Sequence, residues 1–88
     1  MKYIEATKVD KELCLTISME ECSELIQAIS KAKRGKLNKE NLIEEISDVL
    51  ICMDWLKEMY KINESELDNM ILFKKKRIEN RLINKTFK

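Results

Sequence analysis

The sequence contains no proline, no histidine and a single glycine, Gly35. β-Sandwiches and barrels need turn residues at about every tenth position, so this shortage argues against them and favours long helices. The lack of histidine removes the commonest nitrogen ligand of zinc. The three cysteines, Cys14, Cys22 and Cys52, form neither a CxxC motif nor a zinc spacing. We interpret them as reduced, buried residues of an intracellular protein.

Long apolar runs are also missing. No run approaches the roughly 20 residues that a membrane span needs, and the N-terminus MKYIEATKVD lacks a signal-peptide core. We therefore expect a cytoplasmic protein with no membrane partner. The net charge of +1 gives no overall attraction to nucleic acid. Residues 74–88 are basic, but few aromatic residues accompany them, so we do not expect a nucleic-acid partner.

Charged residues make up 38% of the sequence and hydrophobic residues 44%, a composition typical of amphipathic helices. A chain of 88 residues has room for one small domain, residues 1–88. The fold class that we predict is all-α. We expect helices at about residues 8–34, 39–60 and 64–82.

The ends of these helices carry recognisable signals. Thr7 and Asp10 match a capping box at the start of the first helix, and Gly35 is placed to end it in a left-handed conformation. Either Asn38 or Asn41 caps the second helix. Asn63, with Glu66 three residues on, begins the third helix in the same way. The short loop after Gly35 predicts that the first two helices are antiparallel neighbours.

Four carboxylates lie within the apolar faces of the first two helices. Glu21 and Glu24 are three residues apart on the first, and Glu45 and Asp48 are three residues apart on the second. Residues with this spacing are neighbours on a helix. Burying a carboxylate costs several kcal/mol unless a cation or a hydrogen-bond donor compensates it. Both pairs lie at a similar distance from the hairpin turn, so we expect them to meet.

Four oxygen ligands without nitrogen or thiolate favour a hard cation, and Mg²⁺ is the cofactor that we predict, with Mn²⁺ as a possible substitute. Magnesium held by carboxylates usually shares its coordination shell with substrate phosphates. The chemistry that follows is hydrolysis of a phosphoanhydride, in which a metal-polarised water attacks phosphorus.

Cations occupy similar positions on the third helix. Lys74 and Arg81 fall within its apolar stripe, and Arg77 lies at the edge. We expect them to face the same interior as the acids and to bind substrate phosphates. Two alternatives remain open. Lys74 can extend to solvent along an apolar surface, and the two arginines can interact with the helix dipole.

The first helix has a second apolar stripe that two neighbouring helices can hardly cover. Leu15, Met19 and Ile26 form it. Burying this stripe requires another subunit, so we predict a homodimer or a homotetramer.

The two acidic motifs also resemble a known family. EECSEL at residues 20–25, followed by EEISDVL at residues 44–50, is similar to the EExxE…ExxD signature of MazG-like nucleoside triphosphate pyrophosphohydrolases. These belong to the all-α NTP pyrophosphatase superfamily. The resemblance extends from residue 13 to about residue 82.

This resemblance implies an antiparallel helical bundle that is completed by oligomerisation. It implies a catalytic Mg²⁺ site formed by Glu21, Glu24, Glu45 and Asp48, with Glu20 in an outer position. The implied reaction is the hydrolysis of a nucleoside or deoxynucleoside triphosphate to the monophosphate and pyrophosphate. The alternative is a non-catalytic helical dimer that acts as a regulatory or interaction module.

Overall fold

The computed structural model describes residues 2–84, in which every regular element is a helix. A short 3₁₀ helix, η1 (Tyr3–Glu5), leads into α1 (Ala6–Val9). Three long helices follow, α2 (Lys11–Lys33), α3 (Lys39–Met59) and α4 (Glu64–Ile83). The predicted all-α fold class is confirmed. Within the described residues, no helix combines the length and the apolar character that a membrane span needs.

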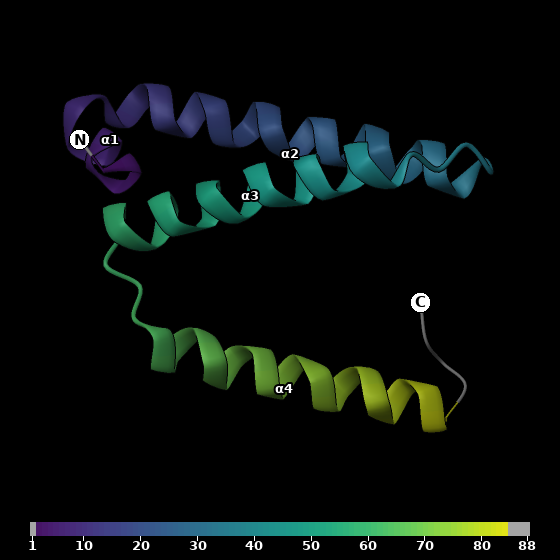
Figure 1. Ribbon diagram of the computed structural model, residues 1–88. Coiled ribbons are helices and arrows are strands. Elements are labelled where there is room, and N and C mark those ends of the chain that lie inside the picture. Colours follow the sequence, from purple (N-terminus) through teal and green to yellow (C-terminus); the bar gives the residue numbers. More distant parts are fainter. Residues whose placement is uncertain (1, 85–88) are drawn as a thin grey trace.

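Helices α2 and α3 form an antiparallel hairpin (Figure 1). Gly35 ends α2 with a φ of 77°, and the Lys36 N–H donates to the Lys31 carbonyl at 2.9 Å, which closes a Schellman motif. The Asn38 side chain accepts from the Asn41 N–H at 3.0 Å, so Asn38 is the residue that caps α3. The predicted turn is confirmed, and the choice between the two asparagines is resolved.

The chain breaks at Asp10, and the prediction of a continuous first helix opened by a Thr7–Asp10 capping box is wrong. Asp10 has a φ of −153° and a ψ of 87°, and its carboxylate accepts from the Leu13 N–H at 3.0 Å. Aspartate competes with the backbone for hydrogen bonds, so it is more stable as a cap than inside a helix. Thr7 instead donates its hydroxyl to the Ile4 carbonyl.

Two hydrogen bonds fasten the N-terminal segment to α3. The Tyr3 hydroxyl donates to Asp54 Oδ2 at 2.8 Å, and the Trp55 indole N–H donates to the Tyr3 carbonyl at 3.0 Å. Tyr3 lies in η1, about fifty residues before its partners in the sequence. The two bonds hold the N-terminal segment against the end of the hairpin that is remote from the turn. The Trp55 indole N–H therefore helps to hold the N-terminal segment in place.

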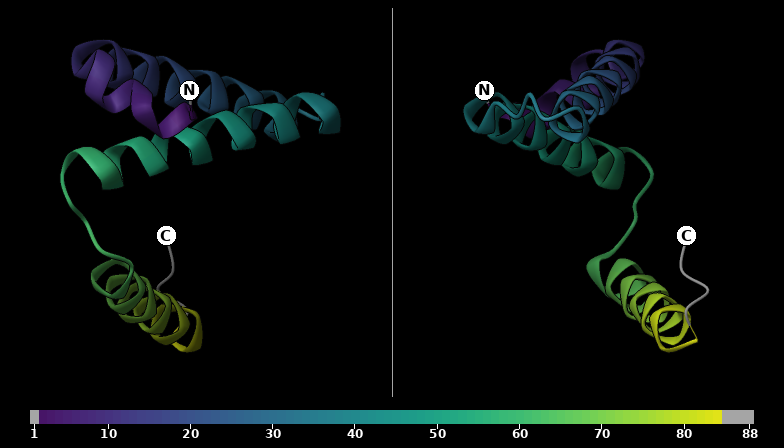
Figure 2. Two further views of the ribbon diagram at one scale, coloured as in Figure 1. Left: turned by 60° about the vertical axis from the view of Figure 1, so that its left-hand side comes forward. Right: turned by 90° about the vertical axis from the view of Figure 1, so that its right-hand side faces the viewer.

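Helix α4 stands apart from the hairpin, as both views in Figure 2 show. Among residues 2–84, no Cα atom of α4 lies within 8 Å of a Cα atom in another helix. The Asn63 side chain caps α4 by accepting from the Glu66 N–H at 2.8 Å, as predicted. The apolar residues that the described chain buries all belong to the hairpin: Cys14, Ala28 and Cys52.

Candidate metal centre

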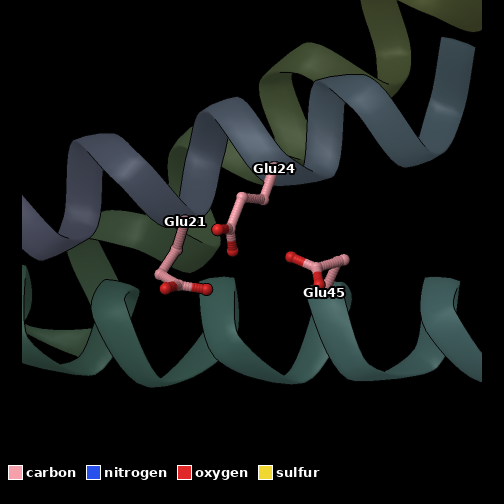
Figure 3. Close-up of side chains that lie close together, drawn as sticks. All are labelled: Glu21, Glu24 and Glu45. Atoms are coloured by element: carbon pink, nitrogen blue, oxygen red, sulfur yellow. The ribbon is translucent and has the colours of Figure 1, made fainter.

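The acidic centre lies between α2 and α3. Figure 3 shows Glu21 and Glu24 projecting from α2 toward α3, with Glu45 projecting back from α3. The antiparallel register sets Glu24 beside Glu45, and Glu21 beside Asp48. The hairpin therefore brings all four predicted carboxylates together, as expected from their equal distance to the turn.

The carboxylates approach closely enough to share an ion. Glu21, Glu24 and Glu45 each place an oxygen within 4.8 Å of the others. A second group with the same spacing consists of Glu44, Glu45 and Asp48. Glu45 belongs to both groups, so it is the residue that links them.

Burial differs between the four carboxylates. Glu45 is only 8% exposed, Glu21 and Asp48 are half-buried, and Glu24 is exposed. Glu21 Oε2 and Glu45 Oε2 are buried without a hydrogen-bond partner in the described part of the chain. An unsatisfied buried carboxylate oxygen is costly, and a bound cation would remove that cost.

No lysine or arginine of residues 2–84 forms an ion pair with the acids of the centre. Burial, hydrogen bonding with Asp48 and the negative charge of Glu24 raise the pKa of Glu21 from 4.5 to about 7. Burial and the negative charge of Glu24 also raise the pKa of Glu45. Crowding of this kind favours the protonated form of a carboxyl group, and a bound cation would favour the ionised form instead.

The sequence did not single out Glu44, although a signal for it was present. It directly precedes Glu45 and lies four residues before Asp48, which is one helical turn. Glu44 is exposed and lies outside the apolar stripe that pointed to the other acids. Glu20, which the resemblance placed in an outer position, is exposed and belongs to neither group of carboxylates.

The cations of α4 do not reach the acids within this chain. Lys74, Arg77 and Arg81 are exposed on a helix that stands apart from the hairpin. The predicted apolar stripe of α4 is present, but the described residues do not bury it. Within residues 2–84, the cations of α4 therefore do not meet the acids of the hairpin, contrary to the expectation from the sequence.

The buried Cys52 thiol also lies beside the centre. Burial raises the pKa of the Cys52 thiol, and an unreactive thiol is a poor ligand for a hard cation. In residues 2–84, no cysteine joins either of the close carboxylate groups. Both close groups therefore offer a cation only carboxylate oxygens.

A helical hairpin with two facing acid pairs defines an all-α protein with an acidic centre suited to a divalent cation. Residues 10–79 match the family described as the MazG nucleotide pyrophosphohydrolase domain. The chain belongs to this family, and membership suggests nucleoside triphosphate pyrophosphohydrolase activity that depends on a divalent metal. No curated protein and no solved structure matches the chain.

Proposed function

We propose that this protein hydrolyses a nucleoside or deoxynucleoside triphosphate to the monophosphate and pyrophosphate, using Mg²⁺ held by Glu21, Glu24, Glu45 and Asp48. The observation that supports this most strongly is the meeting of both acid pairs between α2 and α3, in a chain of the MazG family. Mn²⁺ is a suitable substitute because it accepts the same oxygen ligands.

The residues fit such an ion. The buried Oε2 atoms of Glu21 and Glu45 lack partners among the described residues, and the oxygens of each group lie within 4.8 Å of one another. The donor set contains only oxygen, which suits magnesium better than zinc. When bound, the cation would supply positive charge to the phosphates and lower the pKa of a water molecule.

The carboxylates themselves impose the order of binding. Without a cation, their negative charge repels a triphosphate, so the metal-free protein should bind nucleotide poorly. Because two helices hold these carboxylates, a cation bound by them would position a triphosphate, which would lower the entropic cost of reaction. The net reaction adds water across the α–β phosphoanhydride, so the bridging oxygen leaves with pyrophosphate.

A panel of nucleoside and deoxynucleoside triphosphates tests the proposal. Each is incubated with the protein and Mg²⁺, and pyrophosphate and orthophosphate are quantified separately. We expect equal amounts of monophosphate and pyrophosphate from at least one nucleotide, and none in the presence of EDTA. Orthophosphate as the initial product would contradict cleavage between the α and β phosphates. No product from any nucleotide would favour the non-catalytic dimer.

A further inference from the structure

The acidic centre divides into two overlapping groups of carboxylates. Glu21 and Glu24 lie close to Glu45 in the first group, whereas Glu44 and Asp48 lie close to it in the second. Among the described residues, Asp48 does not join the first group at this spacing, so a cation held there leaves Asp48 and Glu44 without a metal. The groups are adjacent, because Asp48 also hydrogen-bonds with Glu21. The centre therefore offers two neighbouring positions for a cation.

Glu45 distinguishes the second position from an ordinary cluster of surface acids. Its side chain is only 8% exposed, and its Oε2 atom is buried without a partner in the described chain. A buried oxygen that receives no hydrogen bond is costly, and a cation supplies the charge that the chain does not. Glu45 contributes a ligand atom to each group, and a carboxylate has two oxygens. One side chain can therefore bind two cations at once.

The two positions differ in their access to solvent. The first lies between α2 and α3, as Figure 3 shows for Glu21, Glu24 and Glu45. The second is formed by α3 alone, with Glu44 exposed and Asp48 half-buried one helical turn later. Magnesium and manganese retain water molecules and share their coordination shells with phosphates. The second position is thus open to the water and phosphate oxygens that would complete the shell.

The charge of the centre also favours two ions. Five carboxylates make up the two groups, and the ion pairs in residues 2–84 join Lys57 to acids outside them. One divalent cation offsets two of the five negative charges, whereas two cations offset four. A triphosphate that approaches the centre is repelled by every negative charge that stays uncompensated. Two ions therefore leave the centre far less repulsive to the substrate.

We infer that this centre binds two divalent cations, with Glu45 bridging them and with Glu44 and Asp48 holding the second. Glu44 is then a metal ligand in addition to the four acids assigned above. In two-metal sites the ions lie about 3.5–4 Å apart and stabilise both the attacking and the leaving oxygen of a displacement. That role toward a nucleotide rests on the proposed function, but the binding of two ions does not.

Titration with Mn²⁺ alone counts the ions without reference to activity. The protein is stripped of metal with EDTA and dialysed, and the electron paramagnetic resonance signal of free Mn²⁺ gives the number of ions bound per chain. We expect the wild type to bind two. Because one carboxylate bridges the two ions, their low-temperature spectrum should also show exchange coupling between them.

Glu44→Gln is the most informative variant, because Glu44 belongs to the second group only and is exposed, so its loss should not disturb folding. We expect it to bind one Mn²⁺ as the wild type does, to bind the second at least about tenfold more weakly, and to lose the exchange coupling. Glu44→Asp keeps a carboxylate and should recover part of the affinity for the second ion. Glu58→Gln is the matched control. Glu58 is exposed on the same helix and outside both groups, so this variant should bind two coupled ions.

The possible results separate this inference from the proposed function. One Mn²⁺ per chain at saturation in the wild type, or two equally tight ions in Glu44→Gln, would overturn the second position. Two ions without exchange coupling would contradict the bridge through Glu45. Hydrolysis by a protein that binds a single ion would leave the proposed function standing without the second position. Two coupled ions, with no hydrolysis of any nucleotide, would overturn the proposed function and leave the two-ion centre standing.

Discussion

Glu45 belongs to both groups of carboxylates, and its Oε2 atom is buried without a partner in the described chain. Glu45→Gln keeps the shape of the side chain but removes a metal ligand and one negative charge. We expect nucleotide hydrolysis to fall by about a hundredfold or more. The metal-free variant should be at least as stable as wild type, because repulsion from Glu24 and Asp48 is relieved.

Glu58→Gln is the matched control for this substitution. Glu58 lies on the same helix, is exposed and belongs to neither carboxylate group, so its loss should leave turnover unchanged. Rates are compared at saturating nucleotide and Mg²⁺, and stability is compared by urea unfolding in EDTA. Full activity in Glu45→Gln, or unfolding of that variant, would contradict the role assigned to Glu45.

The raised pKa of Glu21 predicts how the stability of the metal-free protein changes with pH. Its pKa is about 7 in the folded protein, against 4.5 for an ordinary glutamate. Between these values the folded state binds more protons than the unfolded state, so stability must fall as pH rises. The contribution of Glu21 is fully present below about pH 4.5 and is lost as pH rises through about 7.

Comparison with Glu21→Gln isolates this effect. The amide resembles the protonated carboxyl, so the variant should lose less stability than wild type between about pH 5 and about pH 8. Urea unfolding in EDTA at several pH values gives both curves. If the two proteins depend on pH in the same way, the pKa of Glu21 is not raised as described.

At the scale of the helices, the end of α3 carries a strained residue. Lys61 has a φ of 52°, a left-handed conformation that costs a residue with a side chain about 1 kcal/mol relative to glycine. Lys61→Gly should therefore stabilise the protein by about 1 kcal/mol.

Gly35 offers the reverse test at the end of α2. Its φ is 77°, and an added Cβ would meet nothing within 4 Å, so Gly35→Ala changes the conformational preference without a clash. We expect this variant to lose about 1 kcal/mol. Both free energies of unfolding come from urea titration. Destabilisation by Lys61→Gly, beside the expected loss for Gly35→Ala, would show that the lysine side chain stabilises the corner.

Local signals predicted some elements well and missed others. Gly35 and Asn63 act through their own backbone and neighbours, so their roles could be read from adjacent residues. The break at Asp10 could not, because a threonine three residues earlier offered an equally good cap. Beside the Asp10 cap, the break is accompanied by the contacts of Tyr3 with Asp54 and Trp55, which lie far away in the sequence.

For the whole molecule, the sequence of α4 predicted an apolar stripe on the helix but not what covers that stripe. Helical periodicity reports which side of a helix is apolar, whereas the partner depends on the path of the chain after Tyr60. The meeting of Glu21 and Glu24 with Glu45 and Asp48 was predictable, because a short turn fixes the register of two antiparallel helices. The acidic centre was therefore predictable, and its surroundings were not.

The exposed surface of the chain predicts that folding depends on protein concentration. A dimer held by a large interface unfolds at a lower temperature when diluted, because dissociation accompanies unfolding. We expect the melting temperature to fall over a hundredfold dilution, and light scattering to give at least twice the mass of one chain. A melting temperature that is independent of concentration, with the mass of one chain, would contradict a dimer.

Magnesium titration of thermal unfolding tests the central claim, that the facing acid pairs form a metal centre. Millimolar Mg²⁺ should raise the melting temperature of the wild type by several degrees, since a ligand that binds only the folded state stabilises it. Glu45→Gln should lose most of this shift, whereas Glu58→Gln should retain it, with ionic strength held constant. A wild-type melting temperature that does not respond to Mg²⁺, or an equal response in Glu45→Gln, would contradict the claim.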